Sequence, residues 1–319
     1  MNNSLKILIL FSFFFNTICI SQTGVNGNNR KEKGAGISGI VYVDGAELHY
    51  MIEGEGIPCL VLGHSLSQRL ILSQTLKNHF MFIFTDLRHD AQSNSSLKIS
   101  EITFDTYLND INAILDTLNL EKTALFAHSY HAFMAVEYAR KYPDKVSFII
   151  LTGCKPSTAW GEGDEFWESD ASKERKTIFK MNLKKLRRDG LTQMPPKERY
   201  VKTYIAMTPK LMYDPRGDLS YIVDVIDNDK DVFLHLQNTI LGDYDIIEGS
   251  KISIPVFLAL GRYDYECPYI LWEERKSIFL NLSYNLFEES GHFPMVEEQD
   301  IFDKKLIHWI AAINSLIKL

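Results

Sequence analysis

Short, unbroken apolar runs alternate with segments of helical spacing along most of this chain, and that alternation restricts its fold more than any other feature. The apolar runs lie at residues 59–63, 80–86, 123–129, 146–153 and 254–261. Runs of this length are typical of strands covered on both faces, as in a parallel sheet. Segments with helical periodicity lie between them, at 67–80, 104–120 and 131–143. The alternation predicts an α/β fold with a doubly wound, mostly parallel sheet.

Further elements are expected at both ends of this pattern. Residues 39–45 and 46–54 are predicted to be two strands joined by a turn at Asp44-Gly45, a dipeptide strongly favoured in hairpins. After the last apolar run we expect a helix around 269–280, a strand at 283–290 and an amphipathic helix at 301–317.

The alternation stops between Lys155 and Gly249, where several helical stretches are rich in aromatic and charged residues. We therefore predict a core made of 38–154 and 250–319, with a helical insertion at 155–249. Because this insertion directly follows a strand, it should lie over the carboxyl ends of the strands, where open α/β sheets bind ligands. The insertion is thus expected to act as a lid.

The first residues differ in composition from the rest. One lysine precedes an apolar run at 7–20, and polar residues follow from Ser21. This pattern predicts a secretory signal peptide at 1–21 and a flexible leader at 22–37. A transmembrane anchor is the alternative, but the run is shorter than the roughly 20 apolar residues that span a bilayer. We expect a secreted or periplasmic protein with no stable membrane anchor after signal removal.

Composition narrows the class of protein. The chain has 34 Lys and Arg against 41 Asp and Glu, a net charge of −7. Nucleic-acid-binding proteins usually carry a basic surplus, so no nucleic-acid partner is expected. Signal removal would leave Cys59, Cys154 and Cys267, whose spacing matches no metal motif. A bridge between Cys154 and Cys267 is conceivable in an oxidising compartment, but buried free thiols are the favoured interpretation.

A candidate nucleophile lies where a predicted strand turns directly into a helix. The segment FAHSYHAF places Ser129 at this turn, as in a nucleophile elbow. Small residues normally lie two positions to either side, because strand and helix approach closely there. Ala127 meets this need and His131 does not. Taken alone, Ser129 could equally be a serine that caps a helix.

Two more polar residues follow later strands. Asp264 comes just after the strand at 254–261, and His292 comes just after the strand at 283–290. The order Ser, Asp, His along the chain is that of an α/β-hydrolase triad. Imidazole can take the serine proton near neutral pH, and a buried carboxylate can orient the imidazole. Each residue alone could be structural, but the three together predict catalysis.

Four segments as a set resemble the α/β-hydrolase superfamily, and more narrowly its lid-bearing members related to proline iminopeptidases and small esterases or lactonases. They are TDLRHDAQSN (family form D-x-R-G-x-G-x-S), AHSYHAFMAVEYARKYPDKV, IPVFLALGRYD and SGHFPMVEE. The resemblance extends from about Gly39 to Leu319. It implies the α/β-hydrolase fold and catalytic roles for Ser129, Asp264 and His292.

The chain departs from this family after the third strand. The usual order is His-Gly, whereas this chain has Gly63-His64, and the H-G-G-P-G form of proline iminopeptidases is absent. The backbone N–H groups of Ser65 and Tyr130 are the predicted oxyanion-hole donors. His64 and His131 could both approach the pocket, and structural roles are favoured for them.

The insertion contains the candidate substrate-binding residues. The segment WGEGDEFWESD sets Trp160, Phe166 and Trp167 among carboxylates that could receive a substrate amine. The alternative is a solvated helix with its aromatic side packed on the core. Other aromatic residues of the insertion could line an apolar pocket: Tyr200, Tyr204, Tyr213, Tyr221 and Phe233.

These features predict a serine hydrolase that cleaves an ester or amide bond of a small, partly apolar substrate or a short peptide through an acyl-enzyme. No metal and no organic cofactor are expected. Two alternatives remain open: a proline-iminopeptidase-like aminopeptidase, and a non-catalytic relative that uses the pocket for recognition. The substrate and the oligomeric state are not predicted by the sequence.

Overall fold

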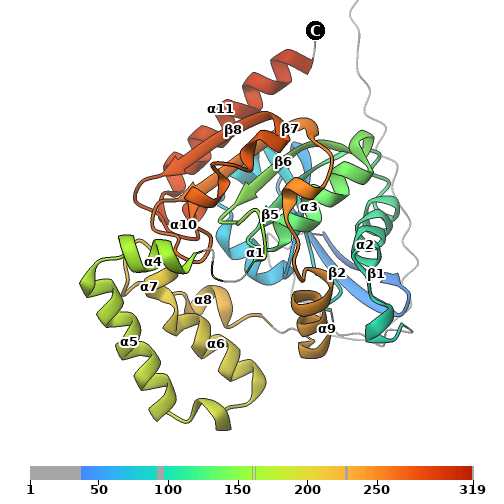
Figure 1. Cartoon of the computed structure of the whole chain (residues 1–319). Coiled ribbons are helices and arrows are strands. Elements are labelled where there is room, and N and C mark those ends of the chain that lie inside the picture. The colour runs from blue at the N-terminus through green and yellow to red at the C-terminus, as the bar shows by residue number, and fades with distance from the viewer. Residues whose placement is uncertain (1–36, 92–96, 160, 162, 227–228, 318–319) are drawn as a thin grey trace, which may run out of the picture. The chain divides into compact units, whose positions relative to one another are not determined.

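An eight-stranded sheet with the order β1-β2-β4-β3-β5-β6-β7-β8 is the centre of the computed structural model, which describes residues 37–91, 97–159, 161, 163–226 and 229–317 (Figure 1). Strands β1, β2 and β4 pair antiparallel, and the strands from β4 to β8 pair parallel. The predicted doubly wound, mostly parallel sheet is therefore confirmed. The strands are β1 (Ile37–Val43), β2 (Ala46–Glu53), β3 (Ile57–Leu62), β4 (Phe80–Thr85), β5 (Thr123–His128), β6 (Val146–Thr152), β7 (Ile252–Gly261) and β8 (Phe279–Phe287).

The predicted hairpin is present between β1 and β2. Asp44 and Gly45 have φ angles of 45° and 75°. Positive φ at both central residues is what a two-residue hairpin turn of type I′ requires, and an Asp-Gly pair adopts it readily. The turn therefore explains why the strand register starts with Val43 opposite Ala46.

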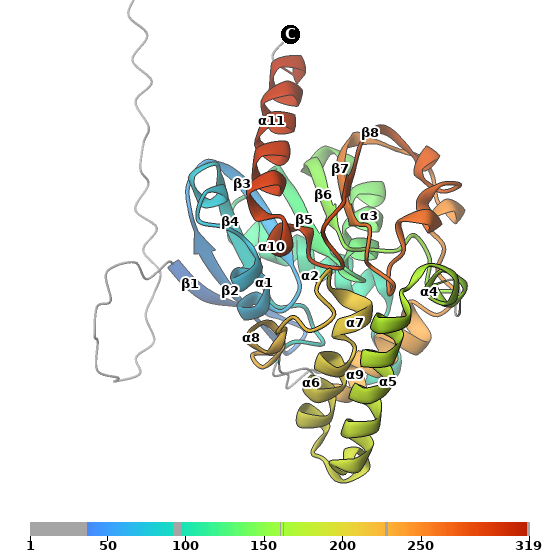
Figure 2. The same ribbon diagram turned by 90° about the vertical axis from the view of Figure 1, so that its left-hand side faces the viewer.

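Two hydrophobic cores lie on the two faces of the sheet, and the alternation of side chains along each strand assigns residues to them. On β3, Leu60 and Leu62 belong to one core, while Cys59 and Val61 belong to the other. Helices α2 (Phe104–Thr117) and α3 (His131–Lys141) cover the first face. Helices α1 (Ser65–Ile71) and α11 (Gln299–Ile317) cover the second, where Figure 2 shows α11 lying along the strands. This double cover explains why the strands are almost uninterruptedly apolar.

The chain between β6 and β7 is mainly helical. Its helices are α4 (Asp164–Asp170), α5 (Lys173–Arg188), α6 (Pro196–Ala206), α7 (Thr208–Leu211), α8 (Ser220–Val223) and α9 (Lys230–His235), which a π-helical turn (Leu236–Ile240) extends. Helices α5 and α6 pack side by side and project from the sheet (Figures 1 and 2). Carbonyl groups of helix α7 accept N–H groups from the loops after β7 and β8. After β8, the short helix α10 (Pro294–Glu297) precedes α11.

Two predicted helices are interrupted in the structure. The helix expected at 67–80 ends at Ile71, because the Ser73 hydroxyl accepts the Leu76 N–H and donates to Asp303 on α11. The helix expected around 269–280 forms only short 3₁₀ turns, at Tyr269–Trp272 and Lys276–Ile278. There the buried Trp272 indole donates to Cys154 O at 2.8 Å. Tertiary contacts thus override the helical spacing at both places.

The N-terminal predictions lie outside the described residues. This holds for the signal peptide at 1–21 and for the leader at 22–37, except that β1 already begins at Ile37. Within the described residues, no helix is both long and apolar enough to span a bilayer. Cys59, Cys154 and Cys267 are buried and unbridged, as the favoured interpretation of their spacing predicted.

Candidate active site

Ser129 occupies a sharp turn between β5 and α3. Its φ of 58° is one that residues other than glycine rarely adopt. The turn is held from both sides, since the Ser129 N–H donates to Thr152 O at 3.0 Å and its carbonyl accepts the Ala132 N–H at 3.1 Å. Such locally strained backbone persists only where the surrounding structure enforces it, and it is the conformation of a nucleophile elbow. The half-buried Ser129 side chain is thereby presented ahead of the first turn of α3.

Asp264 and His292 form a buried hydrogen-bonded pair. The distance from His292 Nδ1 to Asp264 Oδ2 is 2.7 Å, and both side chains are almost fully buried. The other carboxylate oxygen, Oδ1, accepts the backbone N–H groups of Glu266 and Cys267 at 3.0 and 2.8 Å. Asp264 is therefore held by its own loop and in turn orients the imidazole.

The environment of His292 favours its protonated form. Burial alone would lower the pKa of the imidazole, but the charge and hydrogen bond of Asp264, with the nearby charges of Glu266 and Glu297, together raise it above its ordinary value. With Nδ1–H donating to the carboxylate, Nε2 of the neutral ring carries the lone pair. His292 is thus arranged as a general base with an adjacent carboxylate.

A cavity of about 270 Å³ brings Ser129 and His292 together, because both residues line it. No hydrogen bond joins the Ser129 hydroxyl to His292, and such contacts are often long before a substrate binds. Three of the five aromatic residues expected to line a pocket do line this one: Tyr200, Tyr204 and Phe233. The other two, Tyr213 and Tyr221, are exposed, so the prediction was wrong for them.

A second cavity, of about 380 Å³, adjoins the first. Tyr200, Tyr204, Met207, Ile226 and Phe233 line both. Apolar and aromatic side chains of the insertion therefore form a lining that is shared by the cavity of Ser129 and the second cavity. The two cavities together provide a largely apolar space beside the nucleophile.

The loops that carry Asp264 and His292 lie tightly against each other and against α7. A Cβ atom at Gly261 would collide with the carbonyl oxygen of Gly291, so only glycine allows this approach. The His292 N–H donates to Leu211 O at 2.6 Å, and the Tyr265 N–H donates to Lys210 O at 2.8 Å. Helix α7 thus contacts both of these loops.

The structure corrects one predicted oxyanion-hole donor. The Ser65 N–H already donates to Asp86 Oδ1 at 2.8 Å, so a carboxylate occupies the position that the oxyanion would need. The next amide of the α1 N-terminus, that of Leu66, has no hydrogen-bond partner among the described residues, and neither does that of Tyr130. The error arose because the sequence cannot show that Asp86, at the end of β4, lies against this helix.

The predicted aromatic substrate-binding residues lie elsewhere. Phe166 and Trp167 pack against Tyr265 in a separate small cluster and do not line the cavity, while Trp160 lies outside the described residues. The neighbouring carboxylates of α4 are exposed, including those of Glu165 and Glu168. The helix is therefore amphipathic in the ordinary sense, with its aromatic side buried and its acidic side in solvent.

Sequence reasoning missed several polar groups of the cavity. Gln68, Asp90 and Glu266 line the cavity and were not predicted from the sequence. His64 and His131, which were expected to be able to approach the pocket, also line it. His64 caps α1 by accepting the Ser67 N–H at 3.4 Å, the structural role expected of it. The signal for Asp90 was available in TDLRHDAQSN, where His89 stands at a position that is glycine in the family pattern.

Fold and site together define an α/β hydrolase, and comparison with known proteins agrees. Residues 57–299 match the family model described as alpha/beta hydrolase fold, so the chain belongs to that family and is a hydrolase. It is 31% identical over 278 residues to the AB hydrolase superfamily protein YclE of Bacillus subtilis (strain 168), covering 86% of this chain and 98% of that protein.

Two solved structures share the fold. The enol-lactonase from Burkholderia xenovorans LB400 has a TM-score of 0.64 at 19% identity, covering 86% of this chain and 100% of its own. The proline iminopeptidase-related protein TTHA1809 from Thermus thermophilus has a TM-score of 0.63 at 22% identity, covering 87% of this chain and 98% of its own. The resemblance to the α/β-hydrolase superfamily drawn from the sequence segments is confirmed by the family match, and these structures share the fold.

Proposed function

We propose that this protein is a serine hydrolase that cleaves small esters with an apolar acyl group through an acyl-enzyme. One observation carries the proposal: Ser129 sits in a strained elbow and lines the same cavity as a histidine that is hydrogen-bonded to a buried aspartate. A neutral serine is a poor nucleophile until a base takes its proton, and His292 is the proposed base. Asp264 in turn orients His292 through their hydrogen bond.

The proposed reaction runs in two halves. Ser129 Oγ attacks the ester carbonyl while His292 Nε2 takes the hydroxyl proton, and the protonated His292 then gives it to the departing alcohol oxygen. Water, deprotonated by the same nitrogen, attacks the acyl-enzyme and releases the acid with Ser129 restored. The amides of Tyr130 and Leu66 are the proposed oxyanion donors, since the Ser65 amide is occupied. Asp264 stabilises the imidazolium throughout.

The lining of the cavity supports the substrate class. A volume of about 270 Å³ is slightly below the usual range of ligand pockets, about 300–1,000 Å³. Tyr200, Tyr204 and Phe233 give the outer part an apolar surface that continues into the second cavity. A short acyl group fits beside Ser129, and a longer one could extend between α6 and α9.

The acidic cluster around α4, which suggested the aminopeptidase alternative, does not support it in the structure. The carboxylates of α4 that might have received a substrate amine are exposed, as Glu165 and Glu168 show. We therefore expect no preference for a free amine from this cluster. Glu165→Gln should leave the ratio of the hydrolysis rates of aminoacyl esters and their N-acetylated forms unchanged.

Covalent labelling tests the proposal. A fluorophosphonate probe should modify the wild-type chain at Ser129, and Ser129→Ala should abolish both labelling and hydrolysis of p-nitrophenyl esters. Losing a triad member generally leaves only about 10³–10⁴-fold catalysis over water. Ser169→Ala, at an exposed serine of α4, is the matched control and should label normally. Unchanged turnover in Ser129→Ala would overturn the mechanism.

A further inference from the structure

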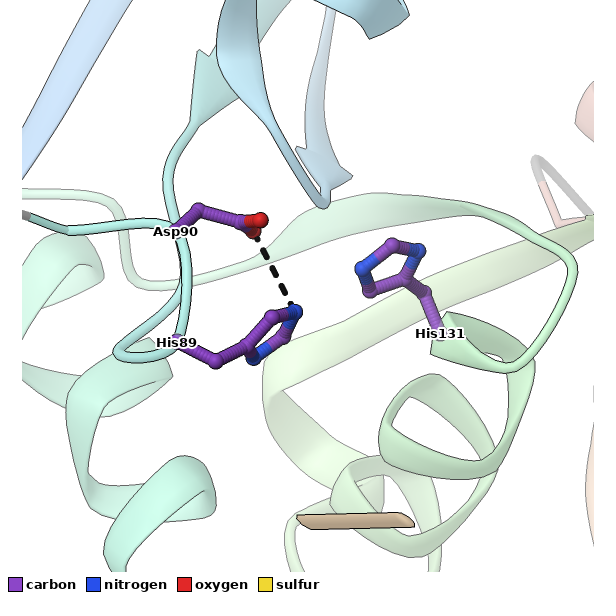
Figure 3. A group of neighbouring side chains, drawn as sticks. All are labelled: His89, Asp90 and His131. Carbon is purple, nitrogen blue, oxygen red and sulfur yellow. Dashed lines mark ion pairs between the residues drawn. The ribbon is translucent and has the colours of Figure 1, made fainter. Parts of the chain in front are cut away.

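Three buried residues with metal-binding side chains meet beside the catalytic cavity without belonging to the Ser-His-Asp set. His89 and Asp90 come from the loop after β4, and His131 is the first residue of α3 (Figure 3). One ligand atom from each can be chosen so that all lie within 4.8 Å of one another. We propose that His89, Asp90 and His131 form a binding site for one divalent transition-metal ion, with Zn²⁺ as the best match.

His131 has the hydrogen-bonding pattern of a metal ligand. Its Nδ1 lies 3.1 Å from the carbonyl oxygen of His128, which can only accept, so Nδ1 carries the proton and Nε2 carries the lone pair. Nε2 is buried and has no hydrogen-bond partner, although the residue is only 6% exposed. Figure 3 shows the ring turning a nitrogen toward Asp90 and His89. Metal-ligating histidines almost always donate their second ring N–H to a carbonyl or carboxylate in this way.

His89 is positioned by two tyrosines. Its Nδ1 lies 3.3 Å from the Tyr107 hydroxyl, and its Nε2 lies 3.0 Å from the Tyr130 hydroxyl and 3.4 Å from Asp90 Oδ2. With Nδ1–H donating to Tyr107, Nε2 holds a lone pair on the side of Asp90. A bound ion takes the place of the Tyr130 hydrogen at this nitrogen, and the hydroxyl can rotate toward another acceptor.

The donor set selects the class of ion. Two imidazoles and one carboxylate suit Zn²⁺ and its transition-metal neighbours, whereas Mg²⁺ and Ca²⁺ prefer oxygen ligands. Asp90 and His131 line the cavity, so a fourth coordination position would open toward it. Three protein ligands with one open position are the arrangement of catalytic rather than closed structural zinc sites. Water or an oxygen atom of a bound substrate would complete the coordination.

Metal titration tests the site without relying on hydrolysis. The purified full chain is treated with a chelator, and Zn²⁺ is then titrated in competition with a chromophoric chelator. We expect one tightly bound ion per chain. Co²⁺ in its place should give the visible absorption bands of a low-coordinate site. Asp90→Asn and His131→Gln should each weaken Zn²⁺ binding by at least about tenfold, since each removes one of three ligands.

Three controls locate the ion and exclude unfolding as the cause of lost binding. His49→Gln removes an exposed histidine on β2 and should bind Zn²⁺ as the wild type does. Cys267→Ser alters the second cluster of suitable geometry among the described residues, which contains Asp264, Cys267 and His292, and should also leave binding unchanged. Thermal unfolding of each metal-free variant shows whether it is folded, and Zn²⁺ should raise the Tm of the wild type more than that of His131→Gln.

The proposal stands independently of the hydrolase mechanism, because both readouts report the ion and not turnover. It is overturned if the wild type binds no stoichiometric Zn²⁺, or if folded Asp90→Asn and His131→Gln bind it undiminished. Loss of binding in Cys267→Ser with retention in His131→Gln would assign the ion to the catalytic pair and equally overturn it.

Discussion

At the scale of single residues, the protonation of His292 controls the proposed reaction. The neutral ring is the base, so activity requires a pH above the pKa of His292. Burial lowers this pKa, but the charge and hydrogen bond of Asp264, together with the charges of Glu266 and Glu297, raise it above the ordinary value of a histidine. We therefore expect kcat/KM for a p-nitrophenyl ester to rise with pH through a midpoint above the pKa of an ordinary histidine and to level off at higher pH.

Asp264→Asn provides the matched test. Removing the charge should move the midpoint below that of the wild type and lower kcat by about 10⁴-fold, because the histidine loses the partner that sets its tautomer. A profile that stays flat from about pH 5 to 9, with chemistry shown to be rate-limiting, would remove His292 from the base role.

The same scale shows what sequence reasoning could reach within the site. Ser129, Asp264 and His292 follow predicted strands, and the carboxyl ends of parallel strands meet at one edge, so their proximity was predictable. The Ser65 error has a different origin: Asp86 is distant in sequence, and only the folded backbone shows its hydrogen bond to that amide. Chain order indicates which loops meet, but not which amide remains unpaired.

At the scale of elements, the placement of α7 depends on one buried arginine of α5. Arg175 donates to the carbonyl oxygens of Pro209, Met212 and Tyr213 at 2.5–2.8 Å. Two other carbonyls in this stretch, those of Lys210 and Leu211, accept N–H groups from the loops that carry Asp264 and His292. Arg175→Met should leave three carbonyls without their donor and lower the free energy of unfolding by about 1–3 kcal/mol.

The Arg175 variant also has a catalytic readout. Because α7 contacts the loop of His292, the rate of fluorophosphonate labelling at Ser129 should fall along with kcat/KM. Arg188→Met, at an exposed arginine of the same helix, is the control and should change neither value. Equal labelling rates in both variants would show that α7 does not support the site.

Elements were predictable to different degrees for a physical reason. Strands covered on both faces need continuous apolar runs, and β3 to β7 were therefore evident in the sequence. The stretch around 269–280 had helical spacing but forms 3₁₀ turns, because Trp272 is drawn into the core to bond Cys154 O. The packing of the inserted helices depends on contacts such as those of Arg175, which no periodicity encodes.

At the scale of the whole molecule, a buried ion pair joins β1, the loop that contains His89 and Asp90, and α2. Arg88 and Asp110 are both fully buried, with Nε to Oδ2 at 2.9 Å, and Arg88 Nη2 also reaches the carbonyl of Val43. Burial raises the pKa of Asp110 to about 6 although Arg88 opposes the shift. For the Asp110 carboxylate, the energetic cost of desolvation therefore exceeds the stabilisation from its attraction to Arg88, as is common for buried ion pairs.

Because desolvation of the charges outweighs their attraction, removing one charge and removing both should have different effects on stability. Arg88→Met leaves Asp110 buried without its cation and should lower the free energy of unfolding by about 3–5 kcal/mol. Arg88→Met combined with Asp110→Leu removes both charges, and its stability should return to within about 1 kcal/mol of the wild type or exceed it. Urea unfolding of the wild type, the two single variants and the double variant at about pH 7 measures this double-mutant cycle. If the double variant is as unstable as Arg88→Met alone, Arg88 acts mainly through Val43 and its loop, and the pair itself contributes little to the fold.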